Sequence, residues 1–311
     1  MCNYKTGAPR VSIVIPHLNE PDLLCRCLQS IATQQHESPP YEIVVADNGS
    51  VIPPVDVCAK FENVRLIVEL MPGPGPARNA GSAVTTGDII AFIDSDCVAQ
   101  PGWISEIVMH FDRHPEVDFL GGAIQVLPKC PGRPNAVEAY ENLFSYRARM
   151  FVEKHKYAAT GNMAVRRRVF EAVGPFSGIS AYEDVLWGQK AVSMGYCISY
   201  LPTAIVLTPG CTSLAELSQR LTRLVVHDFA RYREKVGGRF MWTMLSLLMA
   251  VSPILSAEHV ARSGIAPLRL QVAVFGCLIW ARLFRATLML KILAERDPDR
   301  LLRNWKRPGC T

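Results

Sequence analysis

The sequence predicts an α/β protein: a doubly wound, mostly parallel sheet followed by a partly amphipathic helical region at the C-terminal end. Over the first two thirds, short runs rich in Val and Ile alternate with helix-like stretches. Continuous apolar runs of this kind are typical of parallel strands that are covered on both faces. The four clearest strand candidates are Val11–Pro16, Glu42–Asp47, Arg65–Leu70 and Asp88–Asp94.

The first two strand candidates are separated by a helix candidate, Pro21–Gln34. Its apolar residues recur at helical spacing, at Leu23, Leu24, Cys27, Leu28 and Ile31. Strand, helix and strand at these separations predict right-handed βαβ units. Two later runs, 119–127 and 197–207, are further strand candidates that extend or edge the same sheet.

The pattern of apolar and charged residues changes near residue 213, which predicts a domain of residues 1–213 and a C-terminal region of residues 214–311. Residues 214–235 read as a basic amphipathic helix, and residues 240–257 carry no charge but are interrupted by Pro253. A second apolar run, 270–281, is followed by Arg282 and Arg285. A spanning helix needs about 20 apolar residues, so the first run is borderline in length and the second is too short to span. We therefore expect these helices to lie in a membrane interface. The alternative is a helical cap packed on the core, and residues 297–311 are expected to be loosely ordered.

Composition narrows the class of protein. With 49% hydrophobic and 20% charged residues, the chain is neither disordered nor fibrous. Residues 217–311 carry a net charge of +10 and residues 1–216 a net charge of −5. A basic tail on an acidic body favours a polyanionic partner such as a membrane surface, a nucleic acid or phosphates. Long apolar runs, rather than stacking aromatics, separate the basic residues, which argues against nucleic acid.

The cysteines and the N-terminus predict a cytoplasmic protein. Ten cysteines show no CxxC pair for zinc and no spacing typical of a disulfide framework. Residues 1–10 are polar and lead directly into the first strand, so no secretory signal is expected. A reducing compartment is the simplest interpretation.

Polar residues follow three of the predicted strands, where ligands bind in open parallel sheets. The triplet Asp94-Ser95-Asp96 is the most informative, because two carboxylates at the end of a buried strand can hold a divalent cation and its phosphates. The alternative is that Asp94 caps a turn and Asp96 begins a helix. Alone, this triplet is weak evidence.

Two further segments carry candidate chemistry. The Gly/Pro loop of residues 73–81 leads into a helix and contains Arg78, which offers a guanidinium and backbone N–H groups to an anion. Its alternative is an ordinary turn with a solvated arginine. Glu183 and Asp184 stand at the start of another helix candidate, where an acidic side chain commonly interacts with the helix dipole. The alternative is that the fold places this start in a cleft, where the acid would act as a general base.

In this order the segments resemble the inverting family 2 glycosyltransferases of the GT-A fold. The resemblance runs from Val11 to about Pro209 and is carried by VSIVIPHLNE, DNGS, PGPARNAG, FIDSDC, TGNMAVRR and YEDVLWGQKA. Within the family, the chain is similar to bacterial transferases of exopolysaccharide or glycolipid assembly.

The resemblance implies a site for a nucleotide sugar. The residues that match its donor site are Pro16, Asn19, Glu20, Asp47, Arg78, Asp94, Ser95, Asp96, Gly161 and Asn162. Asp96, with Asp94, would coordinate Mg²⁺ or Mn²⁺ on the diphosphate. Asp184 would deprotonate the acceptor hydroxyl, with Glu183 beside it.

The chain also departs from the family pattern. The second acid after the second strand is Asn48, and Thr208 stands where many relatives place a histidine that completes the metal site. His227 is a possible substitute ligand, and an exposed or capping histidine is the alternative. Arg220 and Arg223 would contact either the diphosphate or membrane phosphates. The QxxRW pattern of processive synthases fails after Gln219, which favours the addition of a single sugar.

The resulting hypothesis is an inverting, metal-assisted transferase. It would pass one sugar from a nucleotide diphosphate sugar, with UDP the family default, to a hydroxyl of a lipid-linked or polysaccharide acceptor. It would work peripherally on the inner face of the cell membrane. Three alternatives stay open: a soluble small-molecule acceptor, a non-catalytic scaffold of a polysaccharide assembly complex, and a nucleotidyltransferase. The last is disfavoured because the first strand is not followed by a Gly-rich basic loop.

Overall fold

A computed structural model describes residues 8–34, 38–177, 182–233 and 235–295. The expected loose order of residues 297–311 therefore lies outside the described residues. The described chain divides into two compact units: residues 1–125 with 147–208, and residues 126–146 with 209–311. The second unit differs from the predicted region 214–311 because it also takes in residues 126–146.

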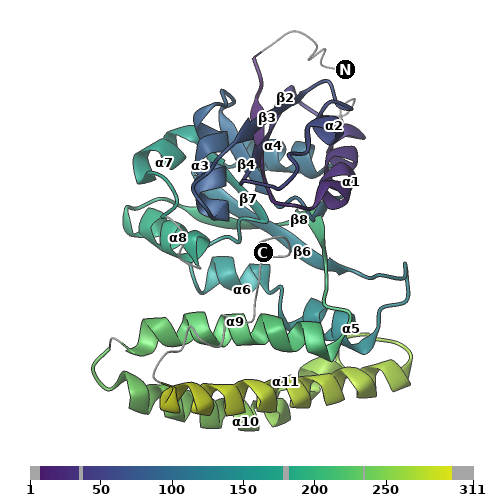
Figure 1. The fold of residues 1–311 in the computed structure, drawn as a ribbon, viewed down its shortest axis with the longest axis vertical. Helices are drawn as coiled ribbons and strands as arrows, with labels where there is room; N and C mark the ends of the chain where they lie inside the picture. The colour runs from purple at the N-terminus through teal and green to yellow at the C-terminus, as the bar shows by residue number, and fades with distance from the viewer. Residues whose placement is uncertain (1–7, 35–37, 178–181, 234, 296–311) are drawn as a thin grey trace. The chain divides into compact units, whose positions relative to one another are not determined.

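The first unit is built on a mixed eight-stranded sheet, which confirms the predicted fold class (Figure 1). The strands lie in the order β3-β2-β1-β4-β7-β6-β8-β5. Their bounds are β1 Val11–His17, β2 Tyr41–Asp47, β3 Val64–Val68, β4 Ile89–Ile93, β5 Val98–Ala99, β6 Phe119–Leu127, β7 Asn162–Arg166 and β8 Ile198–Pro209. The four strands from β3 to β4 run parallel, and β7 pairs antiparallel with both β4 and β6.

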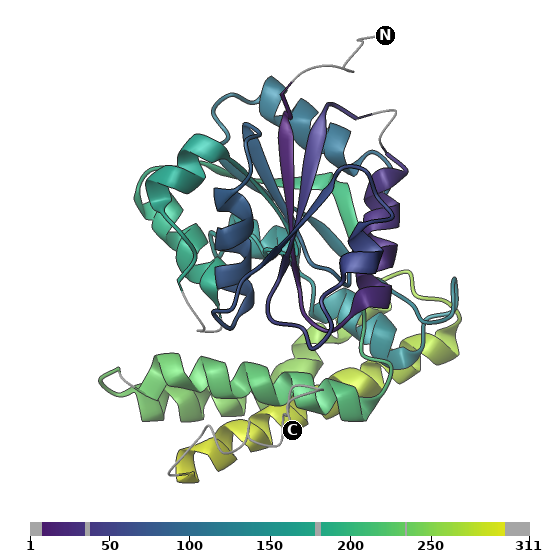
Figure 2. The ribbon, with the colours of Figure 1, turned by 45° about the horizontal axis from the view of Figure 1, so that its top comes forward.

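Helices cover both faces of this sheet (Figure 2). Their bounds are α1 Pro21–Ala32, α2 Val55–Cys58, α3 Pro74–Ala83, α4 Trp103–Arg113, α6 Ala148–Glu153, α7 Arg167–Val173 and α8 Glu183–Ser193. Alternate residues of β1 serve different cores: Ile13 packs in the cluster with α1 and α4, and Val14 in the cluster with α7 and α8. This is the period-2 pattern of a strand buried on both faces.

Close packing of α3 on β1 positions the Gly/Pro loop. A Cβ on Gly81 would lie 2.5 Å from Val14 Cγ1, so only glycine allows this approach. The helix begins at Pro74, directly after Gly73, whose φ is 123°. Pro at the first helical position costs no hydrogen bond. Arg78 is thereby held one turn into a helix that lies against the central strand.

The second unit consists of α5 (Ala136–Phe144), α9 (Leu214–Arg233), α10 (Gly238–Ala261) and α11 (Leu268–Ala294). Val137 and Tyr140 of α5 pack with Leu217 of α9 and Leu278 of α11. This shared core explains why residues 126–146 group with the C-terminal helices.

The helices α10 and α11 are longer than their apolar runs predict. Pro253 lies inside α10 without ending it, and α11 continues through Arg282 and Arg285. Both described helices are long and apolar enough to cross a membrane, by length and composition alone. The expectation that the second run is too short to span was wrong about helix length. The reason is that intramolecular contacts hold the two arginines: Arg282 Nη1 contacts Met249 Sδ, and Arg285 lies 3.8 Å from Asp228.

Candidate active site

The predicted acids lie close together where β4 ends and where β7 and α8 begin. Arg78 Nη2 donates to Asp94 Oδ1 at 2.6 Å, and Arg78 Nη1 donates to Glu183 Oε1 at 3.0 Å. The Arg78 side chain is only 4% exposed, whereas Asp94 is 40% exposed. Asp184 is close enough to Asp94 and Arg78 for both to shift its pKa. One buried guanidinium therefore links the DSD triplet to the acidic start of α8.

Asp96 lies beside Asp94 in a candidate metal cluster. Ligand atoms of Asp94, Asp96 and Cys97 lie within 4.8 Å of one another. Burial, reinforced by the charge of Asp94, raises the pKa of Asp96 to about 6. Burial and the same two acids also raise the pKa of the Cys97 thiol. A pair of crowded carboxylates next to a neutral thiol offers the oxygen ligands that Mg²⁺ and Mn²⁺ prefer.

Gly161 allows the chain to pass close to Asp94. A Cβ at this position would lie 2.9 Å from Asp94 Oδ2, so a side chain would displace the carboxylate. The neighbouring Asn162 is directed into the core instead. It accepts from Trp103 Nε1 at 2.9 Å and donates to the carbonyls of Ala123 and Ala204 at 2.8 and 2.9 Å. Of Gly161 and Asn162, it is therefore the backbone of Gly161 that lies against Asp94.

Asp184 combines burial with a second acid. Burial, followed by the charge of Glu183, raises its pKa to about 6, while the backbone N–H of Val185 and the charge of Arg78 act in the opposite direction. Tyr182 has φ 76°, a rare conformation for a non-glycine residue, directly before α8 begins at Glu183. A carboxylate with a pKa near neutrality is suited to accept a proton.

The ends of β1 and β2 are joined by a buried polar network. His17 Nδ1 lies 2.9 Å from Asp47 Oδ1, and the N–H of Glu20 donates to His17 Nε2 at 3.2 Å. Because Nε2 accepts, the network assigns the imidazole proton to Nδ1. Ser50 donates its hydroxyl to Asp47 Oδ1 and its N–H to Asp47 Oδ2. Asp47 is fully buried, and these contacts occupy three of the four lone pairs of its carboxylate.

Two loops next to this network are fixed by amide side chains. Asn19 has φ 57° and accepts from the N–H of Val51 at 2.8 Å. Asn48 donates to the carbonyls of Glu69 and Met71 and accepts from the N–H of Gly73 at 2.7 Å. The departure from a second acid at position 48 thus has a structural cause, because a carboxylate cannot donate to two carbonyls.

Sequence reasoning missed the roles of His17 and Cys97, although both lie inside quoted motifs. Cys97 directly follows the triplet, and its thiol forms a hydrogen bond with the side chain of Thr208. Position 208 is the one where many relatives place a histidine. The pairing of Val98 with Leu207 brings this part of β8 beside the triplet. The sequence alone does not show that positions 97 and 208 lie close together, because this depends on the pairing of β5 with β8.

The other predicted residues are placed as follows. Pro16 is the second-last residue of β1, Glu20 is exposed just before α1, and Ser95 is buried between the two acids. Arg220, Arg223 and His227 lie on α9, in the second unit. There Arg220 Nη1 donates to the buried Glu141 at 2.9 Å and to Tyr146 at 2.6 Å. Contacts of these three residues with a diphosphate, a metal or a membrane stay predictions.

Comparison with known proteins identifies the family of the chain. Residues 12–174, more than half of the chain, match the family described as Glycosyl transferase family 2. The chain therefore belongs to glycosyl transferase family 2 and is a glycosyltransferase.

Particular relatives fit the same class. Glycosyltransferase AglE of Haloferax volcanii is 30% identical over 207 residues, which cover 65% of this chain and 67% of that protein. Among solved structures, the mannosyltransferase PcManGT from Pyrobaculum calidifontis, in complex with GDP-Man and Mn²⁺, has a TM-score of 0.60 at 18% identity, covering 94% of this chain and 89% of that one. S. aureus TarS 1–349 in complex with UDP-GlcNAc has a TM-score of 0.50 at 16% identity, covering 92% and 91%. At these identities the structures show the fold alone.

Proposed function

We propose that this glycosyltransferase moves a single sugar from a nucleoside diphosphate sugar, with UDP as the expected carrier, to a hydroxyl of a lipid-linked or polysaccharide acceptor with inversion at the anomeric carbon. The observation that carries the proposal is the bridge through Arg78. It holds Asp94, at the donor side, and Glu183, next to the candidate base, within one site.

Asp184 is the general base in this proposal. With a pKa raised to about 6, it is ionised at neutral pH and still accepts a proton readily. It removes the proton of the acceptor hydroxyl as the oxygen attacks, and general-base help of this kind is typically worth about 10²–10⁴-fold. One displacement needs no covalent sugar–enzyme intermediate and inverts the configuration.

Asp94 and Asp96 would hold a divalent cation, Mg²⁺ or Mn²⁺. When bound, such an ion supplies Lewis-acid stabilisation of the negative charge that develops on a leaving diphosphate. Burial and the charge of Asp94 raise the pKa of Asp96, and a bound cation would relieve the repulsion between the two carboxylates. The PcManGT structure, a complex with GDP-Man and Mn²⁺, is consistent with this choice.

Arg78 contributes to the same task from the protein. Two of its guanidinium nitrogens bond to acids, while its Nε is buried and has no hydrogen-bond partner among the described residues. A buried N–H without a partner is costly, so an incoming oxygen would stabilise it. A phosphate oxygen of the donor fits this demand and the positive charge.

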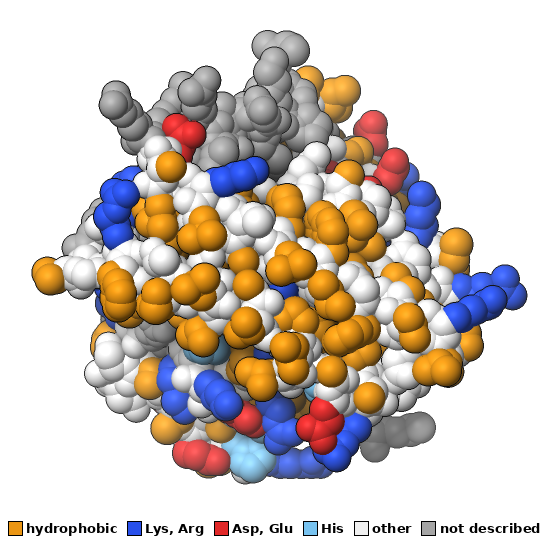
Figure 3. All heavy atoms as spheres, turned by 90° about the horizontal axis from the view of Figure 1, so that it is seen from below, with side chains coloured by type: hydrophobic (Ala, Val, Ile, Leu, Met, Phe, Trp, Pro, Cys, Tyr) orange, Lys and Arg blue, Asp and Glu red, His pale blue; other side chains and the backbone are white. Residues whose placement is uncertain are grey.

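The second unit supplies the membrane part of the proposal. Its helices α10 and α11 expose large apolar side chains, among them Leu248, Ile254 and Leu255, and Figure 3 shows apolar atoms gathered with Lys and Arg at their edges. Because each arginine placed at a bilayer centre costs about 2.5–3.5 kcal/mol or more, Arg282 and Arg285 favour a position in the interface. We propose peripheral attachment to the inner face of the cell membrane, in exopolysaccharide assembly.

Calorimetric titration of the purified chain with UDP, GDP and dTDP tests the proposal. We expect one nucleotide to bind in the presence of Mn²⁺, and EDTA or the Asp96→Asn substitution to reduce the affinity at least tenfold. Asp56→Asn, which removes an exposed acid of α2, is the matched control.

The absence of nucleotide binding would contradict the proposal. If no nucleotide binds with or without metal, the conventional donor site is wrong and a scaffold role is favoured. The sequence features that favour a scaffold are Asn48 and Thr208, and of these Asn48 now has a structural explanation.

A further inference from the structure

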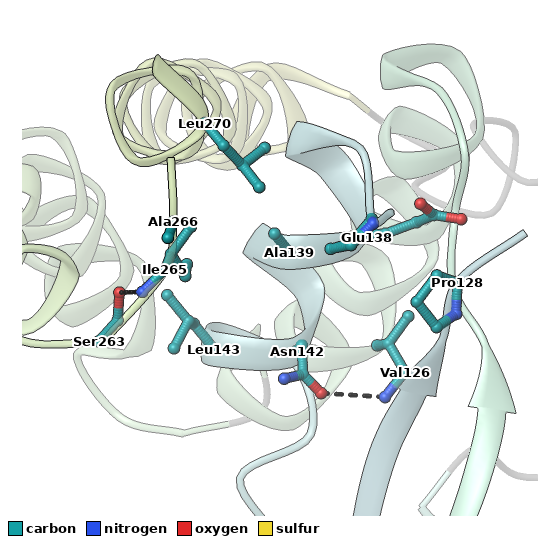
Figure 4. Close-up of a pocket in the computed structure, with 11 residues that line it drawn as sticks. Val126, Pro128, Glu138, Ala139, Asn142, Leu143, Ser263, Ile265, Ala266 and Leu270 are labelled. Atoms are coloured by element: carbon teal, nitrogen blue, oxygen red, sulfur yellow. Dashed lines mark hydrogen bonds between the residues drawn. The ribbon is translucent and has the colours of Figure 1, made fainter. Parts of the chain in front are cut away.

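The second unit contains a cavity of about 270 Å³ that belongs to none of the site described above (Figure 4). It lies between the end of β6, the helix α5 and the connection from α10 to α11. Its wall is largely apolar and includes Val126, Ala139, Leu143, Ile265, Ala266 and Leu270. The volume is slightly below the usual range for small-molecule pockets, so it suits part of a ligand rather than a whole one.

The polar residues of the wall are already engaged within the protein. Glu138 accepts from the backbone N–H groups of Lys129 and Asn135 at 2.7 and 2.8 Å. Asn142 Oδ1 accepts from the N–H of Val126 at 3.0 Å, as Figure 4 shows. The hydroxyl of Ser263 donates to the carbonyl of Val260. Because Glu138, the Asn142 Oδ1 and the Ser263 hydroxyl are engaged within the protein, the cavity favours a hydrocarbon over a sugar or a nucleotide.

Cationic residues flank the cavity in the chain. Exposed Lys129, Arg133 and Arg269 are each the sequence neighbour of a lining residue, namely Pro128, Pro134 and Leu270. Glu138, the acid of the wall, is buried, and its carboxylate caps α5. An apolar cavity with cationic residues next to its lining residues in the chain is complementary to a molecule with an anionic head and a hydrocarbon chain.

The cavity also lies next to the exposed apolar residues of the same unit. Leu268 is 71% exposed and stands two residues before the lining residue Leu270.

We propose that this cavity binds a segment of the hydrocarbon chain of the lipid-phosphate acceptor, with the phosphate near Lys129, Arg133 and Arg269. The inference rests on the proposed function, because it gives the lipid-linked acceptor a place on this chain.

Equilibrium dialysis with radiolabelled farnesyl phosphate, kept below the concentration at which it forms micelles, tests the proposal on the full chain. We expect one saturable site. The substitutions Ala139→Leu and Ala266→Leu narrow the cavity and should each weaken binding at least tenfold. Ala273→Leu makes the same change on the exposed part of α11, outside the wall, and should leave binding unchanged. Thermal melts followed by circular dichroism confirm that each variant is folded.

Competition experiments distinguish the contribution of the hydrocarbon chain from that of the phosphate. Farnesol should compete weakly, and inorganic phosphate should not displace the probe. Full displacement by inorganic phosphate, or equal binding by both cavity variants and the wild type, would overturn the proposal. UDP binding, measured on the same samples, distinguishes the two proposals: a wild-type chain that binds UDP but not farnesyl phosphate refutes only the cavity, and one that binds farnesyl phosphate but not UDP refutes only the donor site.

Discussion

Asp184 is buried beside another acid at the start of a helix, and this arrangement opposes stability while it favours catalysis. The folded protein raises the pKa of Asp184 to about 6, above its ordinary value of 3.8. A raised pKa means that the folded state binds the proton more tightly than the unfolded state. Ionised Asp184 therefore destabilises the fold above about pH 6, and this cost disappears below the unfolded pKa.

The substitution Asp184→Asn should separate these two effects. We expect turnover to fall about 10²–10⁴-fold, because the base is lost. The melting temperature should rise at pH 7.5, by a few degrees, and should not rise at pH 4, where the native carboxyl is already protonated. In the wild type, kcat/KM should decline as the pH falls through about 6.

Asp56→Asn is the control for the removal of one acid, and it should change neither turnover nor the pH profile. A variant Asp184→Asn that retains turnover would rule out Asp184 as the base. A melting temperature that falls at pH 7.5 would contradict the cost that we assign to the buried charge.

The sequence was informative about which side chains carry charge and less so about where they point. Asp94, Asp96, Arg78 and Glu183 were predicted as site residues, and the structure brings them together. The orientation of Asn162 into the core depends on Trp103, 59 residues away in the chain. No local pattern encodes such a contact.

Asn48 connects elements, because its side chain joins the end of β2 to the loop that precedes α3. The substitution Asn48→Asp would place a carboxylate against the carbonyls of Glu69 and Met71. Loss of two buried donors, with repulsion added, should destabilise the protein by about 1–3 kcal/mol or more. Urea unfolding measures this loss, and the KM for the donor should rise because the loop carrying Gly73 leads into α3.

Asn63→Asp is the matched control, since it adds the same charge at an exposed position before β3. Equal stability of the Asn48→Asp and Asn63→Asp variants would show that the loop does not depend on the Asn48 amide.

Periodicity located the parallel half of the sheet but missed β7. That strand is five residues long and lies antiparallel between β4 and β6, so its position depends on pairing with distant segments. The length of α11 was also missed, because Arg282 and Arg285 interrupt its apolar run. Their contacts with Met249 and Asp228 come from other helices of the second unit.

For the whole molecule, the exposed apolar residues of α10 make membrane attachment directly testable. We expect the protein to sediment with vesicles that contain phosphatidylglycerol, and less so as salt rises, because basic residues near an anionic surface contribute about 1 kcal/mol each. The triple substitution of Leu248, Ile254 and Leu255 by Ser should reduce vesicle binding at least tenfold. These side chains are 62%, 78% and 84% exposed.

Val51, Ile52 and Leu70 of the first unit provide a control, since they are exposed to a similar degree, 72%, 79% and 80%. Their replacement by Ser should leave vesicle binding unchanged. If the wild type fails to bind vesicles at low salt, the helices have another partner and the peripheral attachment is wrong.

The grouping of residues 126–146 with the C-terminal helices means that the boundary between the units is not a single point in the chain. The polypeptide leaves the first unit at residue 125, returns at residue 147 and leaves again after residue 208. A protein shortened at residue 213 would retain α5 without the helices that cover Val137 and Tyr140, and Glu141 would keep its charge without Arg220. The C-terminal helices can therefore be exchanged for others only if residues 126–146 change with them, because α5 forms part of the core of these helices.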